Sequence, residues 1–111
     1  MESLEDMRCR AEQGDLDAQY CLGKLYTEGV DGQPPDYAEA FHWFQLGADQ
    51  NDPMSQYELG ILYMYGRGVP VNGNEAVKWL NLAAQQDVVE AGFMIAAIFT
   101  MGELTPIDSK V

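Results

Sequence analysis

The stretch SQYELGILYMYGRGVPVNGNEAVKWLNLAAQQD, residues 55–87, decides the fold because its landmark residues recur on both sides of it. Upstream, its glycine and tryptophan positions have counterparts 37 and 36 residues earlier, so that Gly60 matches Gly23 and Trp79 matches Trp43. Downstream, only the first half of the stretch returns, 36 positions later. A fixed period of this length predicts stacked helical hairpins, each of which is one repeat.

Apolar residues spaced by three and four positions predict the helices of these hairpins. Asp36, Asp52 and Asn72 stand where a helix N-cap is expected, and the glutamates three residues after Asp36 and Asn72 complete capping-box patterns. We therefore expect an all-α solenoid of about six helices, in which half-repeats flank two full repeats. The predicted helices are 2–13, 16–28, 37–50, 54–65, 73–86 and 89–101; the repeats are 15–51 and 52–87, the leading half-repeat is 1–14, and the final half-repeat with its tail is 88–111.

Residues that recur with the period are expected to form the packing of the scaffold. A glycine inside a helix costs roughly 1 kcal/mol relative to alanine, so Gly23 and Gly60 predict the close approach of a neighbouring helix. Ala96 fills the same place in the third copy. The recurring aromatic side chains are predicted to lie in the core: Tyr26, Tyr63, Phe99, Trp43 and Trp79.

The chain is strongly acidic. It has 111 residues, which favours one domain, and its 18 acidic and 6 basic side chains give a net charge of −12. This charge argues against binding nucleic acid or an anionic bilayer and favours a basic partner. Met1 to Asp52 carries a net charge of −9 and the remainder −3. Electrostatic steering is therefore expected to be strongest in the N-terminal half.

A cytoplasmic location is expected from the first residues and from the cysteines. The start, MESLEDMRCRAEQGD, has no basic segment followed by an apolar run, so it does not resemble a secretory signal. No stretch approaches the ~20 apolar residues of a membrane span. Cys9 and Cys21 are expected to be free thiols in a reducing compartment; the alternative is a disulfide between facing helices.

Residue types that carry chemistry are sparse. His42 is the only histidine, and its place on the outer side of a predicted helix indicates a solvated position rather than a general base. One histidine and two cysteines cannot supply a metal set of usual spacing. The loop GRGV at residues 66–69 lacks the Lys-Ser or Lys-Thr that follows a phosphate-binding loop. We therefore expect no enzyme, no cofactor and no metal.

At this point the chain resembles the Sel-one-like repeat family, which is related to the tetratricopeptide repeats. The resemblance implies a right-handed superhelix that binds proteins or peptides, and it implies no reaction. Cys9 and Cys21 do not sit where secreted members of the family pair their cysteines. The second copy carries the pattern through Ser55, Leu59, Gly60, Tyr63, Gly66, Gly68, Val69, Ala76, Trp79, Ala83 and Ala84.

Positions that change between copies are candidates for partner binding. Glu28, for example, becomes Tyr65 and then Met101 in the later copies. Since the first helices of such superhelices line the concave face, an adaptable apolar surface is expected in the C-terminal half, next to acidic residues of the N-terminal half. The alternative is that the apolar side chains pack against neighbouring helices. The predicted partner-binding residues are Ile61, Met64, Tyr65, Met94, Met101, Glu28 and Asp31.

These observations predict a protein-protein interaction module that binds a partner protein or peptide on its concave face. The alternative is a cytoplasmic immunity protein that neutralises a basic toxin or effector, which rests on the charge, on the size of the chain and on analogy with family members. We expect a monomer; self-association through the C-terminal end is the other outcome. Leu104, Pro106 and Ile107 are expected to fold back over that end.

Overall fold

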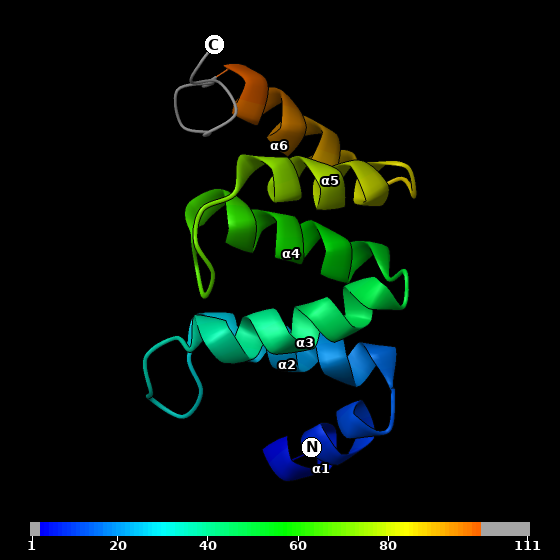
Figure 1. Ribbon diagram of the computed structural model, residues 1–111. Coiled ribbons are helices and arrows are strands. Elements are labelled where there is room, and N and C mark those ends of the chain that lie inside the picture. Colours follow the sequence, from blue (N-terminus) through cyan, green and yellow to red (C-terminus); the bar gives the residue numbers. More distant parts are fainter. Residues whose placement is uncertain (1–2, 101–111) are drawn as a thin grey trace.

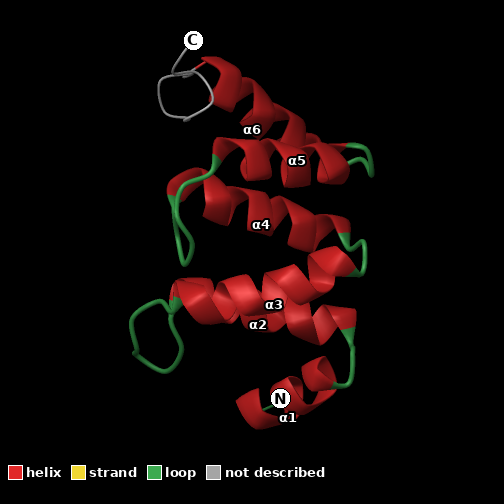
Figure 2. Ribbon diagram, in the orientation of Figure 1, coloured by secondary structure: helices red, strands yellow, loops and turns green. Residues whose placement is uncertain are grey.

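A computed structural model describes residues 3–100 of the chain. The secondary structure of this part consists of helices joined by loops and turns (Figures 1 and 2). The predicted helices are confirmed, and within the described residues their ends differ from the prediction by at most two residues. The helices are α1 (Leu4–Glu12), α2 (Leu16–Glu28), α3 (Tyr37–Asp49), α4 (Pro53–Tyr65), α5 (Gly73–Ala84) and α6 (Val89–Thr100).

Helices that follow one another in the chain pack against one another, which makes the molecule a stack. Contacts run from α1 to α2, from α2 to α3, and so on to α6, and the described chain extends over 49 × 29 × 18 Å. Figure 1 shows α1 at one end of the stack and α6 at the other. The predicted all-α solenoid is confirmed.

Polar residues begin the helices as predicted. The side chains of Asp36, Asp52 and Asn72 each accept a hydrogen bond from the backbone N–H three residues later. Pro53 occupies the first turn of α4, where its missing N–H leaves no hydrogen bond unmade. These N-caps set the starts of α3, α4 and α5.

The capping boxes predicted for α3 and α5 are wrong in their second half. Glu39 does not reach back to the cap; its Oε1 accepts from Trp43 Nε1 at 3.2 Å. The cap's own N–H, on Asp36, donates instead to the carbonyl oxygen of Tyr26 at 2.8 Å. Because the buried indole needs an acceptor, the glutamate serves the tryptophan. The second repeat makes the equivalent bonds from Trp79 to Glu75 and from Asn72 to Tyr63.

The glycines inside α2 and α4 allow the following helix to approach closely, as predicted. A Cβ added to Gly23 would lie 2.5 Å from Cε1 of Phe44 on α3. A Cβ added to Gly60 would lie 2.7 Å from Cγ of Leu80 on α5. Phe44 and Leu80 are themselves fully buried. The space beside each glycine is therefore filled by one large apolar side chain from the next helix.

Two buried glutamines join successive repeats. Gln19 donates from Nε2 to the carbonyl oxygen of Ala11 at 2.9 Å, and its Oε1 accepts from Gln50 Nε2 at 2.9 Å. Each bond satisfies an amide that is excluded from water. The recurrence of glutamine at the repeat period is the sequence signal for this arrangement. In the next repeat Gln56 bonds equivalently to Ala48 and Gln86.

The core prediction for Phe99 is wrong. Its equivalents Tyr26 and Tyr63 are half-buried, but Phe99 is 64% exposed. Tyr63 packs edge-on against Phe41 and belongs to the surroundings of two core clusters, because helices lie on both sides of α4. Among the described residues, no helix follows α6 to cover the equivalent side chain.

Candidate functional site

The predicted binding residues lie on the first helices of the hairpins and on the loop after α2. Tyr65 is 55% exposed at the end of α4, while Glu28 and Asp31 are exposed at the end of α2 and in its loop. The guanidinium of Arg67 lies 5.1 Å from the Tyr65 ring centroid and 5.3 Å from that of Tyr37. This cation–π contact favours one orientation of the Tyr65 ring and leaves more than half of the side chain exposed.

The other predicted residues are less accessible. Ile61, Met64 and Met94 are half-buried, and the two methionines pack against the core cluster of α5 and α6. Met101 lies outside the described residues, as do the tail residues expected to fold over the end. We use the term first-helix face for the side of α2 and α4 that carries Lys24, Glu58, Ile61 and Tyr65.

Glu58 is the polar centre of the first-helix face. Its Oε2 lies 3.4 Å from Lys24 Nζ and accepts a hydrogen bond from the Tyr20 hydroxyl at 3.4 Å. The Glu58 side chain is only 13% exposed. Burial, and then the charge of Glu58, raises the pKa of Tyr20 to about 12. The phenol therefore stays a neutral donor at physiological pH, and it ties α2 to α4.

The same comparison of repeats that selected Tyr65 could have found Glu58. Its position carries Cys21 in the first copy and Met94 in the third, so it changes as the other candidates do. The contact with Lys24 could not be predicted, because it joins two helices that are not neighbours in the chain.

The Lys and Arg side chains of the described residues all contact other groups of the chain. Arg8, Arg10, Lys24 and Lys78 each pair with a carboxylate, and Arg67 lies over two tyrosine rings. Many carboxylates, by contrast, are exposed and form no ion pair within residues 3–100. The charge that the described surface offers to a partner is therefore negative. The exposed unpaired carboxylates include Glu12, Asp17, Glu28, Asp31, Asp87 and Glu90.

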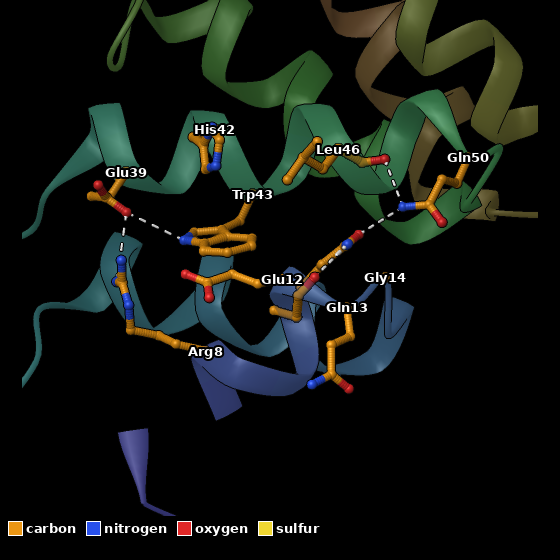
Figure 3. A pocket seen from close by; sticks show the side chains of 11 residues that line it. Arg8, Glu12, Gln13, Gly14, Glu39, His42, Trp43, Leu46 and Gln50 are labelled. Carbon is orange, nitrogen blue, oxygen red and sulfur yellow. Dashed lines mark hydrogen bonds and ion pairs between the residues drawn. The ribbon is translucent and has the colours of Figure 1, made fainter. Parts of the chain in front are cut away.

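A hollow of about 530 Å³ lies between α1 and α3, away from the predicted residues. Figure 3 shows Trp43 at its centre, with Arg8 and Glu39 on one side and Gln50 on the other. Arg8 pairs with Glu39 at 3.9 Å, donates to the Tyr26 hydroxyl at 2.7 Å and lies 5.9 Å from the Trp43 ring centroid. These side chains form their polar and cation–π contacts with one another. The hollow is therefore a place where side-chain contacts hold α1 against α2 and α3.

Catalytic groups do not converge in the described part of the chain. His42 is exposed and meets the Trp43 ring edge-on at 4.9 Å. Cys9 and Cys21 are both exposed and are not joined. Within residues 3–100, no group of three His, Cys, Asp or Glu side chains could hold a metal ion, and no helix is long and apolar enough to cross a membrane.

Comparison with known proteins identifies the repeat. A family model described as "Sel1 repeat" matches residues 16–52 and 53–88. Chitin synthase regulatory factor 3 of Schizosaccharomyces pombe is 34% identical over 88 residues, which are 79% of this chain and 9% of that protein. The ERAD-associated E3 ubiquitin-protein ligase component HRD3A of Arabidopsis thaliana is 33% identical over 67 residues, 60% of this chain and 10% of that protein. The chain thus spans about a tenth of the length of these two relatives.

Solved structures share the fold. A protective antigen of uropathogenic Escherichia coli, described as displaying an SLR fold, superposes with a TM-score of 0.84 and 31% identity. The match covers 97% of this chain and 23% of the antigen. The stack of helical hairpins therefore also occurs as part of a longer chain.

Proposed function

The chain belongs to the Sel1 repeat family, and on that premise we propose that it is a non-catalytic module that binds another protein through the first-helix face. The observation that carries this proposal is the exposed ring of Tyr65, which Arg67 contacts from one side and which belongs to a chain with a large excess of negative charge. An exposed aromatic side chain offers a large contact area to a partner, and aromatic residues are frequent among the residues that carry most of the binding energy. The first-helix face is the surface expected to be concave.

The names of the relatives support a role in protein assemblies. One relative is called a regulatory factor and another a component of a ubiquitin ligase. This chain corresponds to only a small part of either protein, so their activities are not assigned to it. What the chain shares with them is a helical stack, whose long sides are suited to holding an extended segment or a helix of a partner.

A basic partner is proposed from the distribution of charge. Every Lys and Arg of the described chain is already engaged, so unpaired carboxylates are left to act on a partner at long range. We further propose that binding takes place in the cytoplasm, with the protein as a monomer. The same charge also suits the immunity alternative, in which the partner is one basic toxin or effector. A pull-down that recovers a single tightly held basic protein would select that alternative over a general adaptor.

We predict that Tyr65→Asp abolishes capture of the partner in a pull-down with the full chain. Placing a charge at the centre of an apolar contact should weaken binding by at least about thirtyfold, the equivalent of the roughly 2 kcal/mol that defines a hot spot. The exposed position of Tyr65 leaves the fold unchanged, which a circular dichroism spectrum would verify.

The matched control for this experiment is Leu46→Asp. Leu46 is a partly exposed apolar residue on α3, beside the hollow between α1 and α3. The Leu46→Asp variant should capture the partner as well as the unchanged protein does. Full capture by Tyr65→Asp, with loss in Leu46→Asp, would move the binding site from the first-helix face to the hollow.

We also predict that salt slows association. Raising the salt from about 0.1 M to about 1 M shortens the Debye length from about 10 Å to about 3 Å, which screens the unpaired carboxylates from an approaching basic partner. Stopped-flow or surface-based kinetics should show an association rate that falls severalfold while the dissociation rate changes little. An association rate that is indifferent to salt would exclude the steering role of the acidic surface.

A further inference from the structure

Helix α6 lies at the end of the described stack (Figure 1), and one of its sides exposes a stripe of apolar residues. Val89, Phe93 and Phe99 are 65%, 69% and 64% exposed, more than any other large apolar side chain of the described residues. Gly92 and Ala96 lie between them and are also exposed. We call this stripe the α6 end face.

The earlier repeats show what covers this side of a first helix. Ala96 is the equivalent of Gly23 and Gly60, which are filled by Phe44 of α3 and Leu80 of α5. In both cases the covering element is the second helix of the same hairpin, and it brings one large apolar side chain to the small residue. The α6 end face therefore has the shape that accepts one more second helix, with a bulky apolar residue placed over Ala96.

The polar link at the start of the helix differs in the third copy. In the first repeat the end of α3 supplies Gln50, which donates to the buried amide of Gln19. The residue of α6 that corresponds to Gln19 is Gly92, and a Cβ there would meet nothing within 4 Å. Asp87 and Glu90 are exposed close by and form no ion pair within residues 3–100. The start of α6 thus has no glutamine that could form this amide contact, and exposed carboxylates stand near it instead.

We propose that the α6 end face binds an amphipathic helix of another protein, which runs antiparallel to α6 as an additional second helix of the solenoid. This helix has a large apolar residue over Ala96 and Lys or Arg in its last turn, next to Asp87 and Glu90. Basic residues in that turn also complement the negative end of the helix dipole. A second copy of this chain is a poorer occupant, because each copy has a net charge of −12. The surface is separate from the first-helix face.

The test uses the full chain and a peptide made from its own second helix. The probe is residues 71–87 with Gln85→Lys and Gln86→Lys, because this segment covers α4 through Leu80 and the two changes give it a basic last turn. Fluorescence anisotropy should show saturable binding. We expect that a control peptide with Leu80→Asp, and the protein variant Ala96→Glu, each weaken binding by about tenfold or more, since each places a charge in the apolar contact. A probe that keeps both glutamines should bind more weakly and with less dependence on salt.

Further variants keep the proposal falsifiable. Phe99→Ser should weaken binding of the probe as Ala96→Glu does, while Tyr65→Asp should leave it unchanged. The proposal for the α6 end face is thereby tested separately from the proposal for the first-helix face. Absence of saturable binding would overturn the proposal, and so would equal loss in Tyr65→Asp. A dimer of the unchanged chain that dissociates in Phe93→Ser would show that a second copy covers the face. Binding seen only after deletion of residues 101–111 would show that the chain covers it itself.

Discussion

Replacing Phe44 with alanine is expected to lower the free energy of unfolding by about 3–5 kcal/mol, the usual range for removing a large buried aromatic side chain. Phe44 is fully buried, fills the space left by Gly23 and lies 5.9 Å, between ring centroids, from Tyr20. Its loss would leave a cavity between α2 and α3, since a helical glycine has no side chain that can move in. Urea denaturation followed by circular dichroism measures the change.

The pairing of Phe44 with Gly23 makes a sharper prediction. In the unchanged protein Gly23→Ala should be destabilising, because overpacking typically costs about 1–3 kcal/mol and exceeds the roughly 1 kcal/mol gained in helix propensity. In the Phe44→Ala background the added methyl group finds space, so Gly23→Ala should become stabilising. The sign of the effect reverses between the two backgrounds.

Gly92→Ala is the matched control for this double-mutant cycle. Gly92 is also a helical glycine, but it is exposed and an added Cβ would meet no atom within 4 Å. Its substitution should therefore stabilise the protein in both backgrounds by the same amount. If Gly23→Ala behaves as Gly92→Ala does, the close contact between Gly23 and Phe44 does not constrain the fold.

The second large effect is expected for Gln56→Leu. Leucine is close to glutamine in size, but it cannot donate to the carbonyl oxygen of Ala48 or accept from Gln86 Nε2, which lies 2.9 Å from Gln56 Oε1. Because Gln56 is 1% exposed, its polar partners lose hydrogen bonds in a site that excludes much of the water. We expect a loss of about 1–3 kcal/mol in the free energy of unfolding.

An exposed glutamine supplies the control for Gln56. Gln85 lies at the end of α5 and faces solvent, so Gln85→Leu should change stability by no more than about 0.5 kcal/mol. Thermal and urea denaturation of both variants give the comparison. A Gln56→Leu variant as stable as Gln85→Leu would mean that the buried amide does not hold successive repeats together.

Much of the scaffold could be predicted because its determinants are local in the sequence. The spacing of apolar residues defined the helices, Asp52 and Pro53 marked the start of α4, and the recurrence of Gly23 and Gly60 predicted close packing. Each of these signals depends on residues within one or two turns of helix, or on the period itself. Membership of the repeat family follows from the same residues.

The candidate site was only partly predictable. Comparison of the copies selected Tyr65, which is exposed. It also selected Met64 and Met94, which are partly buried and pack against a core cluster. The sequence pattern alone does not separate these cases, because they depend on which side chains pack against the core cluster of α5 and α6. Glu58 changes between the copies as Tyr65 does and could have been selected, but its contact with Lys24 could not be predicted, because Lys24 comes from the preceding repeat.

The sequence by itself determined the repeat, the order and approximate ends of the helices, the fold family and the excess of negative charge. The tertiary structure decided that Glu39 serves Trp43, that all described cations are engaged, and that Phe99 is exposed although its equivalents are half-buried. Periodicity describes one copy in terms of another and treats all copies as equal. Burial and pairing depend on which neighbour is present, and α6, at the end of the described stack, has a neighbour on one side only.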